Sequence, residues 1–210
     1  MEEVLDLYAR PYDSAHPQVC FDEKSVELHA EMRASLPMQP GHRKRQDYEY
    51  RRCGAQNVFL FIEPKAGCRH VLVIAHRTKL DWAKAMRYLV DELYPQAEWI
   101  DVVLDNLNTH KADVLIEIFG KAEADRLLSH LRFHYTPKHG SWLNIAEIEL
   151  SVLERQCLRH RRLSDAYTLA TELIAWERPR NDAAITIRWK FSKEDARRVF
   201  AKYYPAGLNC

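Results

Sequence analysis

Short apolar runs that end on an aspartate are the feature of this sequence that most limits its fold. Val19-Cys20-Phe21 leads directly into Asp22, and residues 99–104 lead into Asp105. Runs of this length, bounded by turn-forming residues, are typical of buried β-strands. Similar runs at residues 58–62, 71–75 and 131–135 predict further strands, and Pro64 and Gly67 between the first two of these favour an antiparallel hairpin.

Helical periodicity fills most of the remaining sequence. Thr78-x-x-Asp81 and Ser192-x-x-Asp195 are capping boxes, and Asn108 or Thr109 can cap a helix that Gly120 closes. The expected helices cover residues 1–10, 78–94, 108–119, 144–159, 164–177 and 192–203, with Pro179 ending the fifth. Residues 33–56 are expected to be irregular. A hairpin followed by alternating strands and helices predicts an α/β fold, a mixed sheet flanked by helices, with extra helices at the C-terminus.

Composition excludes several classes of protein. Apolar residues make up 47% of the 210 residues, enough for a real core, and the formal charge of +1 gives no argument of its own for nucleic acid. The five cysteines are irregularly spaced, which indicates neither a disulfide framework nor a zinc site. Without a signal peptide or a long apolar run, the expected setting is a reducing cytoplasm and no membrane.

Asp22 and Asp105 share a setting that favours metal binding. Carboxylates at the ends of neighbouring strands can converge above a sheet, and Mg²⁺ takes oxygen ligands of this kind. The alternative is that each aspartate only starts a turn or caps a helix.

Two longer segments narrow this choice. One is Leu104-Asp105-Asn106, followed by His110, and the other is Leu143-Asn144-Ile145-Ala146-Glu147 after the turn at residues 137–141. With an early strand ending in an acid, this ordered set resembles the DDE transposases of bacterial insertion sequences related to the mariner superfamily. The resemblance covers nearly the whole chain. One departure is Ile145, where the family usually has proline.

The resemblance implies an RNase H-like fold and a catalytic, metal-binding triad of Asp22, Asp105 and Glu147. On this basis residues 1–17 form an N-terminal helix and linker, residues 18–163 the catalytic domain, and residues 164–210 a helical extension packed on it. Glu147 has two competing interpretations. It could cap its own helix by bonding to the Asn144 amide, and Glu149 lies nearer the apolar stripe of that helix, so it is a rival third acid.

The mechanism implied by the family uses two Mg²⁺ or Mn²⁺ ions about 3.5–4 Å apart. One activates water or a DNA 3′-hydroxyl, and the other stabilises the leaving oxygen. The partners are then transposon ends and target DNA, with a thymine–adenine target dinucleotide, and a homodimer is expected because two ends must be held together.

Basic residues supply candidate DNA contacts. Arg43, Lys44, Arg45, Arg51 and Arg52 form a possible phosphate-binding loop, although charge runs are usually solvated faces. His110 could touch a phosphate or a neighbouring acid, or lie on the surface at a helix start. Lys138 and His139, before Glu147, could contact DNA or only form a solvated turn, which Trp142 could anchor.

The function expected from these residues is metal-dependent DNA cleavage and strand transfer by a transposase core in the bacterial cytoplasm, associated with the nucleoid when bound to DNA. The family usually carries helix-turn-helix domains before this core, and no such helix can be placed here. The alternative is therefore a catalytically idle fragment that regulates full-length transposase or binds DNA. A nuclease acting on RNA–DNA hybrids or junctions fits the motif order less well.

Overall fold

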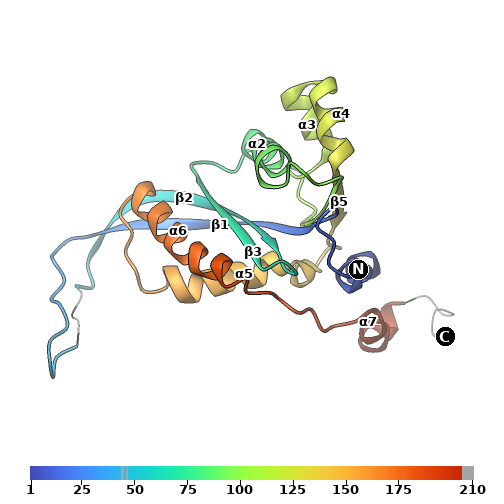
Figure 1. Ribbon diagram of the computed structural model, residues 1–210. Helices are drawn as coiled ribbons and strands as arrows, with labels where there is room; N and C mark the ends of the chain where they lie inside the picture. The colour runs from blue at the N-terminus through green and yellow to red at the C-terminus, as the bar shows by residue number, and fades with distance from the viewer. Residues whose placement is uncertain (44, 46, 205–210) are drawn as a thin grey trace.

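A five-stranded mixed sheet forms the centre of the molecule (Figure 1). The computed structural model describes residues 1–43, 45 and 47–204. The strands are β1 (Gln18–Glu31), β2 (Tyr50–Glu63), β3 (Cys68–Ile74), β4 (Ile100–Leu104) and β5 (Leu131–Tyr135), in the spatial order β3-β2-β1-β4-β5. β1, β2 and β3 pair antiparallel, whereas β4 runs parallel to both β1 and β5. The predicted mixed sheet and its hairpin are confirmed.

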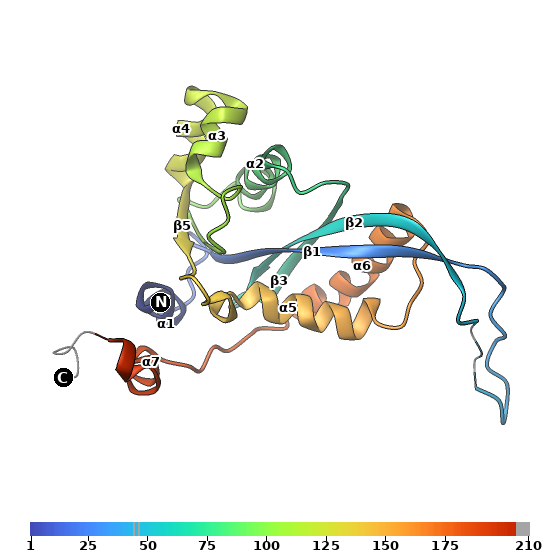
Figure 2. The same cartoon turned by 180° about the vertical axis from the view of Figure 1, so that it is seen from behind.

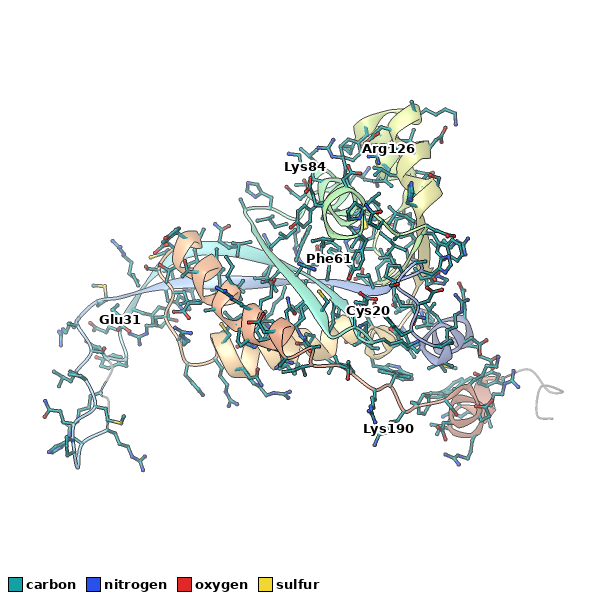
Figure 3. The ribbon with its side chains drawn as sticks, viewed as in Figure 1. Cys20, Glu31, Phe61, Lys84, Arg126 and Lys190 are labelled. Carbon is teal, nitrogen blue, oxygen red and sulfur yellow. The ribbon has the colours of Figure 1, made fainter. Side chains whose placement is uncertain are left out.

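Alternation along the strands creates two apolar layers. Phe21, Phe59 and Phe61 pack against helices on one face, whereas Cys20 and Leu60 face the other layer. Figure 3 labels Phe61 and Cys20, one from each layer. The first layer holds α2 (Lys79–Tyr88), α3 (Ala112–Phe119) and α4 (Lys121–His130), and the second holds α1 (Glu2–Ala9), α5 (Ile145–Leu153), α6 (Ala166–Asp182) and α7 (Lys193–Val199). Figure 2 shows α5 and α6 on one side of the sheet and α2, α3 and α4 on the other.

The two longest strands were underestimated from sequence. β1 continues to Glu31 and β2 begins at Tyr50, so Asp22 lies inside a strand and does not end it. Their register continues, with one bulge, to the pair Glu31 and Tyr50. In this part of the hairpin β1 pairs with β2 alone. The described residues of the connecting loop, 32–43, 45 and 47–49, project away from the helices (Figures 1 and 2). We call residues 32–49 with the adjoining strand ends the arm.

Several helix boundaries also differ from expectation. Lys111, and not Asn108 or Thr109, is the N-cap of α3, and α4 was not predicted at all. Asp165 caps α6, which runs through Pro179 to Asp182. Contacts with the sheet hold this last turn in place despite the proline: the Asn181 side chain accepts a hydrogen bond from the Arg69 amide and donates one to its carbonyl, at 2.9 and 2.7 Å.

These contacts also cover an edge of the sheet. β3 is an edge strand, and the Val71 amide donates to Glu177 of α6 at 2.9 Å. Side chains of α6 therefore form hydrogen bonds with backbone groups of β3 that would otherwise be free to pair with another strand. Within the described ranges no helix is long and apolar enough to cross a membrane, and Cys20, Cys53, Cys68 and Cys157 are free thiols.

Candidate active site

Asp22 and Asp105 lie on adjacent parallel strands. The register pairs Cys20 of β1 with Val103 of β4, so two residues further along Asp22 comes level with Asp105. Asp105 follows the last residue of β4, and beyond it β1 is paired with β2 alone. The sheet thus opens beside both carboxylates. The position of the site is therefore set by the end of β4 at Leu104, because β1 continues beyond Asp22 to Glu31.

Glu147 reaches the same region from the first turn of α5. The side chain of Asn144, which is 1% exposed, donates to the Phe21 carbonyl at 2.8 Å and accepts from the Ala146 amide at 3.1 Å. It therefore caps α5 and ties the start of this helix to β1, one residue before Asp22. The Asn144 amide donates to the Ser141 carbonyl at 2.7 Å, so Glu147 does not serve as its capping partner. The Glu147 side chain is exposed.

Glu149 has a different environment. It is 1% exposed, and its Oε1 lies 2.6 Å from Nε of Arg69 and 2.9 Å from a terminal nitrogen of Arg180. Arg69 is itself fully buried and also donates to the carbonyls of Gly67 and Ile185. The two acids of α5 thus divide into one that faces solvent and one that is committed to a buried ionic network joining β3, α5 and α6.

Electrostatic interactions couple Asp22 to Asp105 and Glu147. Burial is the main cause that raises the pKa of Asp22 to about 7, and the hydrogen bond from the Glu23 amide opposes this shift. The negative charges of Asp105, Glu147 and Glu23 add to the rise. An aspartate whose charged form is destabilised by burial and by neighbouring carboxylates is a group on which a bound cation has a large effect.

His110 is held within the site by acids. Its Nδ1 lies 2.6 Å from Oδ1 of Asp105, and its Nε2 lies 3.8 Å from a carboxylate oxygen of Glu23, an ion-pair contact too long for a hydrogen bond. Burial alone would lower the pKa of His110, but these two acids outweigh it and raise the pKa to about 9. The imidazole packs against Phe21 and Trp82 and is 1% exposed. Of the three possibilities, contact with a neighbouring acid is the one observed, and a surface position is wrong.

The chemistry of the acids fits a hard cation, but their positions do not yet form a complete ligand set. Carboxylate oxygens are the ligands that Mg²⁺ and Mn²⁺ take in proteins. Among residues 1–43, 45 and 47–204, no three acids, histidines or cysteines stand close enough together to hold one ion. Asp105 has one oxygen engaged by His110. Mg²⁺ usually keeps several waters and binds through one or two carboxylates together with substrate phosphates, so water and DNA oxygens would complete its ligand set at this site.

Comparison with known protein families gives a match over the segment that contains Asp22, Asp105 and Glu147. The model of the DDE superfamily endonuclease family matches residues 17–170, which is more than half of the chain. The chain belongs to the DDE superfamily endonucleases. No curated protein matches it.

Solved structures give the same fold for this DDE endonuclease domain. The Mos1 mariner paired-end complex with Mn aligns with a TM-score of 0.58 at 15% identity, covering 88% of this chain and 54% of that one. The Mos1 strand transfer complex aligns at 0.56 and 16% identity, covering 88% and 55%, and the paired-end complex with Mg at 0.53 and 16%, covering 97% and 61%. The expected RNase H-like fold is thereby confirmed, and the chain spans between half and two thirds of these Mos1 chains.

The expected DNA contacts of the DDE endonuclease domain fall in two separate places. Arg43 and Arg45 are exposed on the loop of the arm, and Arg51 and Arg52 are exposed on β2 where the arm begins; Lys44 lies outside the described residues. Lys138 and His139 are exposed in the turn before α5 and line a hollow of about 530 Å³ with Trp142 and Tyr203. Trp142 anchors this turn by ring contacts with Trp189 and Phe191.

Three features of the site were missed from sequence. Glu23 contacts His110 on the face opposite Asp22, and strand alternation at Asp22-Glu23 was the available signal. The second was the hydrogen bond that Asn144 donates to the Phe21 carbonyl, because its acceptor lies on a strand 123 residues away in sequence. Arg69 was also missed, and its signal was a charged residue inside an apolar strand together with an inward-facing Glu149.

Proposed function

We propose that this chain is the catalytic core of a DDE transposase that cleaves DNA at transposon ends and joins those ends to target DNA. One observation carries the proposal. Asp22 and Asp105 stand level on adjacent parallel strands, and Glu147 at the start of α5 is close enough for its charge to raise the pKa of Asp22. The membership of the family and the fold shared with Mos1 complexes support the same activity.

Asp22, Asp105 and Glu147 are the residues that would hold two Mg²⁺ or Mn²⁺ ions. When bound, such ions supply activation of the attacking oxygen and stabilisation of the leaving oxygen. The Mos1 paired-end complexes were solved with Mn and with Mg, which supports these two metals. His110 holds Asp105 through one oxygen, and Asn144 fixes the start of α5 against β1, so both are positioning residues.

DNA contacts are proposed for Arg43, Lys44, Arg45, Arg51 and Arg52 of the arm and for Lys138 and His139. Their exposure in the described part, and the positive charge of most of them, support contacts with phosphates. His110 is not retained as a direct DNA contact because its ring is buried. An origin in a bacterial insertion sequence and a homodimer engaged with two DNA ends complete the proposal.

The deciding experiment is nicking of a DNA that carries the ends of the element, with Mg²⁺ or Mn²⁺ supplied. We expect nicking by the wild-type chain, and a loss of at least about 100-fold in Asp105→Ala, because an essential ligand is removed. Equal activity of the two proteins would refute the catalytic assignment. Asp125→Ala, which removes an exposed acid on α4, is the matched control and should leave nicking unchanged.

A further inference from the structure

A groove runs between β1 and α5, starting at the acids. Its first part is a hollow of about 410 Å³ lined by Glu23, Lys24, Glu147, Ser151, Glu154 and Arg155, among others. A second hollow of about 350 Å³ shares Lys24 and Glu154 with the first and continues along β1 to His29 and His160. The two hollows adjoin each other at Lys24 and Glu154, and we call them together the β1–α5 groove.

The direction of the groove connects two features already described. It begins beside Glu147 and follows β1 toward the arm, where Arg51 and Arg52 are exposed on the partner strand. From Asp22 to Glu31, β1 is about 30 Å long at about 3.3 Å per residue. That is the axial length of about nine base pairs at 3.4 Å each. One stretch of DNA backbone can therefore pass both the acids and the arm.

Lys24 stands over the middle of this groove. It is two residues beyond Asp22 on β1, so both side chains point to the face of the sheet that α5 covers. Its Nζ lies 3.4 Å from a carboxylate oxygen of Glu154, and the two side chains are 35% and 42% exposed. A half-exposed pair of this kind contributes little to stability. It does hold the lysine across the groove and close to the acids.

Arg155 is a second cation in the groove. It is exposed, and within the described part of the chain no acid forms an ion pair with it. Two acids of the groove, Glu23 and Glu147, lie at the end near Asp22, whereas Glu154 lies where the two hollows meet and Glu27 lines the second hollow. Cations that begin one step beyond an acidic centre suit a polyanion whose reacting phosphate sits at the acids and whose next phosphates lie along the groove.

We propose that the β1–α5 groove binds the DNA phosphate backbone next to the cleaved bond, with Lys24 exchanging its Glu154 partner for a phosphate and Arg155 contacting another. This inference rests on the proposed transposase function and adds the path of the DNA to it. Glu154 then acts as a competitor of DNA for Lys24. The contact is to phosphates, so it is independent of base sequence.

The test is that substitutions of Lys24 and of Glu154 should change DNA affinity in opposite directions. Lys24→Gln removes a phosphate contact, whereas Glu154→Gln frees Lys24 and removes a repulsive charge, although both variants break the same ion pair. Binding of two fluorescent 30-base-pair duplexes of unrelated sequence is measured by anisotropy between 50 and 200 mM salt, amounts typical for such titrations. Lys24→Gln should weaken the Kd about 5- to 10-fold at about 0.1 M salt and flatten the salt slope by about 0.9. Glu154→Gln should tighten the Kd about 2- to 5-fold.

Matched variants control for simple loss of an ion pair. Lys79 and Glu117 form a pair of similar exposure on the other face of the sheet, at 2.7 Å, and Lys79→Gln and Glu117→Gln should leave the Kd and the salt slope unchanged. Arg155→Gln should weaken binding as Lys24→Gln does, and melting temperatures verify that each variant folds. If Lys24→Gln and Glu154→Gln shift the Kd in the same direction, or not at all, the groove is not the DNA path. Wild-type protein that neither binds nor nicks DNA would instead overturn the transposase function itself.

Discussion

The Nδ2 atom of Asn144 lies 2.8 Å from the carbonyl oxygen of Phe21, and through this bond the helix that carries Glu147 is fixed to the strand that carries Asp22. The same side chain accepts from the Ala146 amide as the N-cap of α5. The donor and the acceptor of the buried Asn144 side-chain amide thus do different things. The acceptor starts the helix, and the donor sets its position relative to the acids.

Asn144→Asp separates these tasks because it keeps the capping acceptor and removes the donor. We expect the helix content to stay the same by circular dichroism. The Mg²⁺ concentration for half-maximal nicking should rise about 10- to 100-fold, the usual effect of losing a group that orients metal ligands. Asn144→Ser, which can also cap but cannot reach the Phe21 carbonyl, should behave alike. An unchanged Mg²⁺ requirement in both variants would show that the bond to Phe21 is not what positions Glu147.

Glu147 and Glu149 should respond oppositely to the same substitution. Glu147→Gln changes an exposed side chain, so its melting temperature should stay near that of the wild type while nicking falls at least about 100-fold. Glu149→Gln leaves Arg69 buried without its charged partner and should lower the free energy of unfolding by about 3–5 kcal/mol. Urea unfolding and nicking assays on both proteins check this. A Glu149→Gln protein that is stable but inactive would make Glu149 the third acid.

Asp22 should make the metal-free protein less stable as pH rises. The folded protein holds the Asp22 proton up to a pKa of about 7, whereas the ordinary value is 3.8. Between these values the folded state binds more protons than the unfolded chain, so stability falls with increasing pH and the full loss is present above about pH 7. Asp22→Asn removes this loss. At pH 8 we expect it to stabilise the metal-free protein by on the order of 1–3 kcal/mol, discounted for partial solvent exposure.

Thermal or urea unfolding at pH 4 and pH 8, with a chelator present, measures that difference. The difference between the two proteins should be small at pH 4, which is close to the pKa of 3.8 in the unfolded chain, and should vanish only at lower pH, where Asp22 is protonated in both states. Added Mg²⁺ should stabilise the wild type and have little effect on Asp22→Asn. Equal pH dependence of the two proteins would mean that Asp22 is not destabilised by its surroundings.

The parts of this fold that were predictable from sequence are those with local signals. The strand before Asp105, the hairpin of β2 and β3, and the capping boxes at Thr78 and Ser192 depend on periodicity and on nearby residues. The outer half of β1 was not predictable, because its strand structure comes from pairing with β2 and polar residues interrupt its apolar ones. Pro179 was read as a helix end because the contact between Asn181 and Arg69, which holds the last turn of α6, is invisible in the local sequence.

The candidate site shows the same division. The ordered motifs around Asp105 and Glu147 nominated the acids, but helical periodicity alone left Glu147 and Glu149 as rivals. Partners from distant strands give the two acids different environments: Arg69 of β3 pairs with Glu149, and Phe21 of β1 fixes Asn144, the cap residue of the helix that carries Glu147. His110 was placed correctly beside an acid only as one of several alternatives, since its burial depends on Phe21 and Trp82.

The arm offers a last prediction, about DNA binding without chemistry. Arg162 anchors its base by bonding Glu31 at 2.8 Å and the Glu49 carbonyl at 2.9 Å, and its guanidinium lies 5.4 Å from the centre of the Tyr50 ring. Figure 3 labels Glu31 where the arm leaves the body of the molecule. Arg51 and Arg52 lie at this anchored base and remain exposed, so a fixed support holds both side chains toward solvent.

The double variant Arg51→Gln/Arg52→Gln should lower DNA affinity and reduce the salt slope of binding by about 1.8, that is, about 0.9 for each lost phosphate contact. The double variant Lys84→Gln/Lys121→Gln removes the same charge from exposed positions on α2 and α4 and should leave the slope unchanged. Anisotropy titrations over a range of salt concentrations compare the two. Equal slopes for both variants would mean that the arm acts only through net charge, because a true phosphate contact changes the slope at the position where it is made.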